Sequence, residues 1–246
     1  MSERLDDVRR MVDMTAPTQV AGVRTSAEVV AGVETLAGGA GLILGRKAGG
    51  GPAVRELFSS DPREILAVGT IGLAKVLAFR ALALGAQVWV ETRRVAAWDS
   101  FIRTSAGASG AIRVVREFPD TRFASEDRPV LVIVDSDSSL SEDDQVGTPW
   151  TTVLTMYAQL TTWNAADLTH ADLAVMQKLT PGEVRLASTT VRGNDAAQRL
   201  ESVAPDELSL LAGNNLEVVT LELTSVERYM IGDVSRTRRR GAEAKG

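Results

Sequence analysis

Residues 63–85, REILAVGTIGLAKVLAFRALALG, decide the fold of this chain. The run EILAVG is continuously apolar and predicts a buried strand, and LAKVLAFRALALG predicts a helix with Gly85 as its C-cap. Gly69 and Gly72 mark a tight turn between the two. Strand, turn and helix in this order begin an α/β fold, in which ligands bind at the carboxyl ends of the strands.

The rest of the core repeats this alternation of strands and helices. The sequence predicts a hairpin over 42–58, strands over 87–92, 111–118, 129–135 and 172–179, helices over 95–104 and 151–163, and a closing hairpin over 207–223. A capping box, Thr180 to Glu183 with Pro181 between them, starts one more helix. The pattern indicates a mostly parallel, doubly wound sheet of the P-loop or Rossmann-like kind, with helices on both faces.

Two segments flank this α/β domain, which we place at 41–232. Residues 1–40 have apolar side chains at helical spacing and end in glycines, which predicts an N-terminal helical arm. We expect the arm to be an amphipathic element that docks on its own domain or on a partner. Residues 233–246 contain RTRRR and predict a basic, disordered tail.

Composition excludes several classes of protein. The chain has 246 residues, a net charge of −5, no cysteine and one histidine, so thiolate chemistry, disulfides and His-rich metal sites are excluded. The acidic balance and the 4% aromatic content argue against nucleic acid as a partner. The charged N-terminus is unlike a signal peptide, and Lys75, Arg80 and Gln87 interrupt the most apolar stretch. We therefore expect a cytoplasmic protein.

The turn at 69–76, GTIGLAKV, matches a P-loop in part. Gly69 and Lys75 stand at the first and the lysine positions of G-x-x-x-x-G-K-[ST], but Ala74 replaces the second glycine and Val76 the hydroxyl residue. Asp135 ends a buried strand where a Walker B aspartate would stand, and Ser136 follows where many such ATPases carry a glutamate. The positions of an ATPase site are present, and much of its chemistry is missing.

A dinucleotide fingerprint and a plain structural turn are the alternatives. Ala67, Gly69 and Gly72 match two of the three glycines of G-x-G-x-x-G, and Glu91 ends the next strand at the spacing of a ribose-binding acid. A tight turn between a strand and a helix also needs glycines for packing alone. Asp135 opens an acidic D-x-D stretch that is interpreted as a solvated loop, with magnesium binding as the alternative.

The order of these motifs resembles a known family. The hairpin LILGR…GGGPAVRELF, then GTIGLAK, VLVIVD, and the run from ADLAVMQKL to LTSVERYMIG resemble the FtsK and HerA family of hexameric translocation ATPases. More narrowly, GAQVWVETRRVAAWDSF and LTSVERYMIG resemble actinobacterial proteins of type VII (ESX) secretion clusters. The resemblance implies protein partners in a membrane machine, at the inner face of the membrane, and multi-subunit assembly, with a homo-oligomer left open.

These observations lead to one main expectation and one alternative. Because Ala74, Val76 and Ser136 depart from the ATPase pattern, we expect a pseudo-ATPase subunit that works through protein contacts, without catalytic residues, metal or resident cofactor. ATP and NAD(P) remain the two ligands left open, with Gly69, Gly72, Lys75, Glu91 and Asp135 as the residues to bind them. The alternative is an NAD(P)-dependent oxidoreductase, although the chain has no Tyr-x-x-x-Lys pair to supply a proton.

Overall fold

A computed structural model describes residues 41–107, 109–135, 147–191, 193 and 195–236. The predicted arm over 1–40, residues 237–246 of the predicted tail, and most of the acidic stretch after Asp135 lie outside the described residues. Within the described ranges, no helix is both long enough and apolar enough to cross a membrane.

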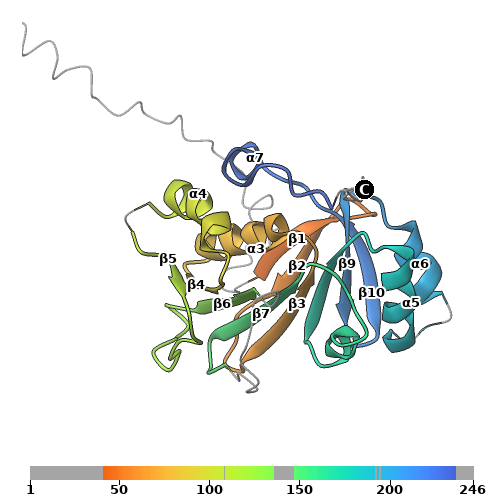
Figure 1. Cartoon of the computed structure of the whole chain (residues 1–246), viewed down its shortest axis with the longest axis horizontal. Helices are drawn as coiled ribbons and strands as arrows, with labels where there is room; N and C mark the ends of the chain where they lie inside the picture. The colour runs from red at the N-terminus through yellow and green to blue at the C-terminus, as the bar shows by residue number, and fades with distance from the viewer. Residues whose placement is uncertain (1–40, 108, 136–146, 192, 194, 237–246) are drawn as a thin grey trace, which may run out of the picture. The chain divides into compact units, whose positions relative to one another are not determined.

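A sheet forms the centre of the domain (Figure 1). It has ten strands in the order β2-β1-β10-β9-β8-β3-β7-β6-β4-β5. In chain order the strands are β1 (Gly41–Lys47), β2 (Pro52–Glu56), β3 (Arg63–Val68), β4 (Gln87–Glu91), β5 (Ile112–Val115), β6 (Val130–Asp135), β7 (Thr151–Tyr157), β8 (Leu173–Gln177), β9 (Glu207–Ala212) and β10 (Asn215–Thr220).

The middle and one edge of the sheet are parallel. Strands β8, β3, β7, β6, β4 and β5 all run in one direction. The β9–β10 and β1–β2 hairpins continue the sheet in antiparallel pairing toward the other edge. The predicted α/β class, the mostly parallel sheet and both hairpins are therefore confirmed.

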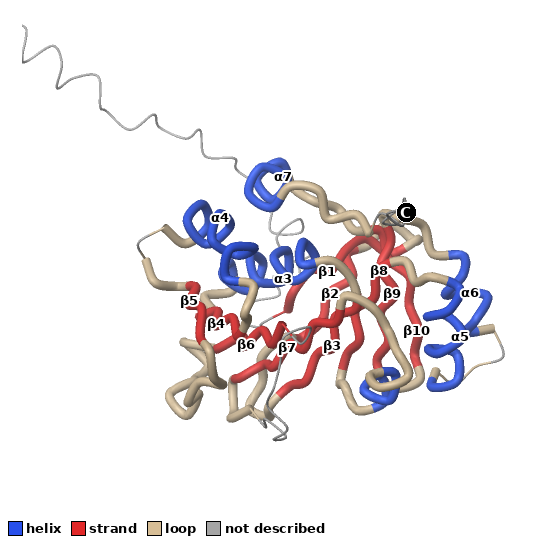
Figure 2. The backbone as a smooth tube through the Cα atoms, viewed as in Figure 1, coloured by secondary structure: helices blue, strands red, loops and turns tan. Residues whose placement is uncertain are grey.

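Helices cover both faces of the sheet, as Figures 1 and 2 show. Along β3, Ile65 and Ala67 pack in one hydrophobic cluster with α3 and α4, whereas Leu66 and Val68 pack in a second cluster with α5 and α6. This alternation follows from the pleat of a strand that is buried on both faces. The helices are α3 (Ile71–Ala83), α4 (Val95–Ser105), α5 (Pro181–Thr190), α6 (Ala196–Ser202) and α7 (Ser225–Ile231), with a 3-10 turn η3 (Ala165–Thr169).

Helix α3 forms because its sequence is rich in alanine and leucine, which favour helix, and because its small side chains allow close packing on the sheet. The helix ends in a Schellman motif. The N–H of Ala86 donates to the carbonyl of Ala81 (3.1 Å), and the N–H of Gly85 donates to that of Leu82 (2.9 Å). Gly85 has a φ of +83°, which favours glycine, and so fulfils the predicted C-cap role just past the last helical residue.

The predicted helix over 151–163 is wrong. Residues Thr151–Tyr157 form strand β7, which lies between β3 and β6 and pairs with both. The apolar spacing of Val153, Met156 and Leu160 suggests one face of a helix, but Val153 and Met156 pack in different clusters on opposite sides of the sheet. Three threonines and a valine among the seven residues favour a strand, and burial on both faces decides it.

The β1–β2 hairpin joins the rest of the sheet through a short pairing of β1 with β10. Only Arg46 and Lys47 of β1 pair with β10, and the register of the hairpin shifts between Ile43 and Gly45. At Gly45 the two backbones are so close that an added Cβ would lie 2.4 Å from the carbonyl oxygen of Thr220. A glycine is required here for space.

We expect Gly45→Ala to lower the thermal midpoint by about 2–12 °C. Overpacking of this kind costs ~1–3 kcal/mol, and ~1 kcal/mol shifts a domain of this size by roughly 2–4 °C. Thermal unfolding followed by circular dichroism measures the change. Gly49→Ala is the matched control, since a Cβ at Gly49 meets no atom within 4 Å; equal midpoints for the two variants would contradict this account.

Candidate functional site

The turn after β3 is shorter than a phosphate-binding loop. The strand ends at Val68, Thr70 is the N-cap, and α3 begins at Ile71. The N–H of Leu73 already donates to the carbonyl of Thr70 (3.0 Å). In a P-loop the backbone N–H groups of this stretch would surround a phosphate; here residues 71–74 belong to the helix.

The side chain of Gln177 fills the space beside this turn. Gln177 ends β8, is 2% exposed, and accepts a hydrogen bond from the N–H of Thr70 at 2.7 Å. Gly69 is required for this approach, because a Cβ there would lie 2.3 Å from Oε1 of Gln177. This glycine, a candidate both for ligand binding and for a plain structural turn, thus makes room for a side chain of the neighbouring strand.

Residues 233–236, which the sequence assigns to the basic tail, instead lie against the same turn. The carbonyl of Val234 accepts hydrogen bonds from Nε2 of Gln177 (2.5 Å) and from Oγ1 of Thr70 (3.0 Å). An added Cβ on Gly72 would lie 3.0 Å from Cγ1 of Val234. The carboxyl end of β3, where this fold binds ligands, is therefore covered by the chain itself.

Lys75 points toward α4. Its Nζ lies 5.9 Å from the ring centroids of both Trp98 and Phe101, which is the distance of a cation–π contact. Burial lowers the pKa of Lys75. Among the described residues no carboxylate forms an ion pair with it. The lysine thus contributes to the packing of α3 on α4.

Asp135 is engaged by its own domain. Its carboxylate accepts hydrogen bonds from Oγ1 of Thr92 (2.7 Å) and from Nε of Arg94 (2.9 Å), and a second guanidinium nitrogen of Arg94 completes a bidentate pair. The side chain of Asp135 is fully buried. A magnesium ion at this carboxylate would compete with the positive charge of Arg94.

The side chain of Glu91 lies on the face of the sheet that is turned away from α3 and α4. Val88 and Val90 of β4 pack in the cluster with α3 and α4, so the alternation of the strand directs Glu91 to the other face. The residue is 9% exposed, and burial raises the pKa of its carboxyl. Its Oε2 atom has no hydrogen-bond partner among the described residues. A buried carboxyl is poorly placed to bind the ribose of a dinucleotide.

The sequence-predicted residues contact different parts of the domain. Gly69 and Gly72 contact Gln177 and Val234, while Lys75, Glu91 and Asp135 each have separate surroundings. No group of three or more acidic or histidine side chains in the described part of the chain could hold a metal ion. The roles of Gln177 and Val234 carry no sequence motif, and only the packing of the sheet reveals them.

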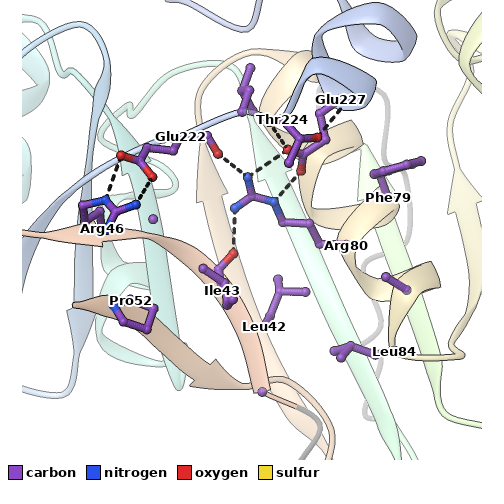
Figure 3. Close-up of a pocket in the computed structure, with 14 residues that line it drawn as sticks. Leu42, Ile43, Arg46, Pro52, Phe79, Arg80, Leu84, Glu222, Thr224 and Glu227 are labelled. Carbon is purple, nitrogen blue, oxygen red and sulfur yellow. Dashed lines mark hydrogen bonds and ion pairs between the residues drawn. The ribbon is translucent and has the colours of Figure 1, made fainter. Parts of the chain in front are cut away.

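A separate groove lies between the β1–β2 hairpin, the second half of α3 and the segment that leads into α7 (Figure 3). Its volume is about 590 Å³, and its apolar lining includes Leu42, Phe79 and Leu84. Arg80 of α3 stands at its wall. The sequence does not reveal this groove, because its lining comes from segments that are far apart in the chain.

Arg80 joins the three parts of this groove. Its guanidinium donates to the carbonyls of Ile43 (2.6 Å) and Glu222 (2.7 Å) and forms an ion pair with Glu227 at 2.6 Å. Glu227 also forms a capping box with Thr224 at the start of α7. Burial alone would raise the pKa of Glu227, but the hydrogen bonds from Arg80 and Thr224 hold it below its usual value.

We expect Glu227→Gln to weaken the dependence of stability on acid. Because the folded-state pKa of Glu227 lies below the ordinary 4.5, its stabilisation is fully present above that pH and is lost as the pH falls through the folded-state pKa. The variant should lose ~2 kcal/mol at neutral pH, in the range of a hydrogen bond to a charged group, and should lose less than wild type on further acidification.

Thermal midpoints measured from neutral pH to below 4.5 test this expectation. Glu126→Gln, at an exposed position, is the matched control and should follow the wild-type curve. Parallel curves for wild type and Glu227→Gln would show that this carboxylate does not contribute to the acid response.

Comparison with known proteins gives a likeness in fold. No family model and no curated protein match the sequence. Among solved structures, VirB4 of Thermoanaerobacter pseudethanolicus matches 77% of this chain and 98% of its own, with 8% identity and a TM-score of 0.50. The DNA-packaging ATPase B204 of Sulfolobus turreted icosahedral virus matches 67% of this chain and 99% of its own, with 14% identity and a TM-score of 0.46.

The cytoplasmic domain of the Thermomonospora curvata type VII secretion ATPase EccC also matches, over 79% of this chain and 31% of its own, with 12% identity and a TM-score of 0.43. At such low identity only the fold is carried over, and VirB4 is the structure of these three whose likeness supports it. The chain has a mixed α/β fold similar to that of VirB4.

Proposed function

We propose that the chain is a non-catalytic protein-interaction component of a type VII (ESX)-like secretion machine in an actinobacterium. The observation that carries the non-catalytic part is the contact of Val234 and Gln177 with the turn at 69–72. A ligand at the carboxyl end of β3 would have to displace the chain's own residues. The secretion context is supported by the resemblance of the sequence, and the likeness to VirB4 supports the fold that such a component would have.

Three departures from the site of an ATPase support this proposal. Residues 71–74 are helical, Val76 has no oxygen for magnesium, and Asp135 is paired with Arg94. Phosphoryl transfer depends on a bound metal ion and on precise positioning of the phosphates. A chain without a phosphate-binding loop, a hydroxyl ligand for magnesium and an available Walker B carboxylate is therefore expected not to catalyse it. The oxidoreductase alternative is not favoured, because Glu91, the residue expected to bind the ribose, is buried.

Apolar side chains around the groove support a role in protein contacts. Ile43 lines the groove and is 53% exposed, and Val226 and Tyr229 of α7 are 50% and 84% exposed. Helix α7 packs on α3 and α4, so these side chains belong to the same side of the domain as the groove. Exposed aromatic and aliphatic residues next to a groove are typical of protein interaction surfaces.

We expect the purified chain to release phosphate from Mg–ATP no faster than buffer. The reason is the missing magnesium ligand at position 76 together with the filled turn. A steady-state phosphate-release assay measures the rate, with Lys75→Ala as the matched variant. Turnover of ~1 s⁻¹, the low end for such enzymes, that disappears in Lys75→Ala would overturn the non-catalytic assignment.

We also expect a photoreactive amino acid at Tyr229 to cross-link to a subunit of the secretion machine in the living host. Trp163, which is 92% exposed and lies in the loop between β7 and η3 rather than on α7, is the matched control position. Mass spectrometry of the cross-linked products identifies the partner. Equal yields at the two positions, or a product from Trp163 alone, would contradict α7 as part of the interface.

A further inference from the structure

Residues Gly232–Arg236, the strap, are bound to the domain in the way a peptide ligand is bound. Helix α7 ends at Ile231, and Gly232 follows it with a φ of +82°, which favours glycine and turns the chain out of the helix. After this turn the apolar side chain of Val234 is only 8% exposed. The strap therefore packs through one apolar side chain, although it belongs to no helix or strand.

The backbone of the strap accepts hydrogen bonds from two side chains, one at the end of β8 and one at the start of α3. Gln177 uses both ends of its amide, since Oε1 accepts from the N–H of Thr70 while Nε2 donates to the carbonyl of Val234. The hydroxyl of Thr70 donates to the same carbonyl. Hydrogen bonds to a main-chain carbonyl hold a peptide without depending on its side chains.

Arg236 gives the second, side-chain-specific part of this recognition. Its guanidinium donates to both oxygens of Glu183 (2.6 and 3.1 Å) and to the carbonyls of Ala158 (2.6 Å) and Lys178 (3.2 Å). The side chains of Arg236 and Glu183 are 15% and 5% exposed. A planar guanidinium is the group that fits such a set of acceptors.

The receiving groups are held in place by contacts that do not involve the strap. Glu183 forms the capping box of α5 with Thr180 and accepts a hydrogen bond from the N–H of Leu160 (2.9 Å). Burial alone would raise the pKa of Glu183, but the bonds from Arg236 and Thr180 hold it below its usual value. Beside the strap lies a cavity of about 500 Å³ that Gln177, Leu208 and Val234 line. The site is thus built by β8, α3 and α5, apart from the strap itself.

We propose that these residues form a peptide-binding site, the strap site, which also accepts the strap of a second copy of this chain. The required peptide chemistry is a small apolar residue followed two positions later by arginine. A second copy carries this sequence by identity, and exchange of an identical element is a low-cost route to association. This inference does not depend on which machine the chain serves.

The chain's own strap competes with any other peptide. A tethered segment of this length acts at an effective concentration on the order of mM. A peptide added to wild type should therefore bind weakly, and it should bind well only where the chain's own strap is released. Arg236→Glu should release it, because the new carboxylate would face Glu183.

The first test uses a fluorescent peptide of residues 230–237, MIGDVSRT, and the full-length Arg236→Glu chain. Fluorescence anisotropy should show binding about ten-fold or more tighter than to wild type, given the competing effective concentration. The same peptide with alanine at its arginine is the matched control and should lose binding. No binding by an Arg236→Glu chain that still unfolds cooperatively, or equal binding of the control peptide, would overturn the strap site.

A thiol reports release of the strap directly, because the chain has no cysteine. Val234→Cys should react slowly with a thiol reagent in the wild-type background and at least several times faster when combined with Arg236→Glu. A Tyr229→Cys chain, exposed in both backgrounds, calibrates the reagent. A thiol that stays protected in the Arg236→Glu background would contradict the strap's dependence on Arg236.

Mixing two variants tests whether the strap site of one copy binds the strap of another. Arg236→Glu keeps the site and has a defective strap, whereas Glu183→Gln keeps the strap and weakens the site. Light scattering should give the monomer mass for each chain alone and twice that mass for the mixture. Peptide binding without this complex would overturn the second copy as the occupant. Failure of the strap site would leave the phosphate-release result unaffected, so the two proposals fail separately.

Discussion

The hydrogen bonds of one buried amide, that of Gln177, connect the end of β8 to the β3–α3 turn and to the strap. This side chain accepts from the backbone of the β3–α3 turn and donates to the carbonyl of Val234. A buried amide without partners is costly, so both bonds must form together. Gly69 follows from this constraint, since only a residue without Cβ leaves the amide in place. A glycine at this position of a nucleotide-binding pattern can thus be required for packing alone.

Two carboxylates in this fold have the same pair of roles. Glu183 and Glu227 each close a capping box at the start of a helix, and each also pairs with an arginine that is distant in the sequence, Arg236 and Arg80. The same side chain therefore satisfies N–H groups at a helix N-terminus and neutralises a nearly buried guanidinium. One pair ties the C-terminal residues to α5, and the other ties α7 to α3 and β1. Local capping and tertiary contacts depend on the same two groups.

Much of the fold could be predicted from the sequence, because its signals are local. The apolar run of β3, the alanine-rich helix after it and the capping box at Thr180 each have a pattern of their own, and each forms as expected. The sequence of strand β7 predicts a helix instead, because a strand that is buried on both faces has no alternation of apolar and polar residues to distinguish it.

The candidate site was harder to predict, since it depends on contacts between distant segments. The sequence gives Gly69, Gly72 and Lys75 in the spacing of a binding loop, but it does not show that Gln177 and Val234 cover the turn or that Lys75 faces Trp98. Asp135 was placed correctly at the end of a strand, whereas its pairing with Arg94 follows from a turn at the end of β4. Motifs predict where a ligand could bind, and the surrounding packing decides whether the space is open.

The strap has a consequence for how the stability of the domain responds to the cell. A nucleotide-binding protein gains stability as its free ligand rises above the dissociation constant, so its folded population varies with the metabolic state. Here the carboxyl end of β3 is occupied by Val234, a residue of the same chain, whose local concentration does not vary. The contacts of Val234 therefore stabilise this part of the domain by an amount that does not depend on the concentration of any free ligand.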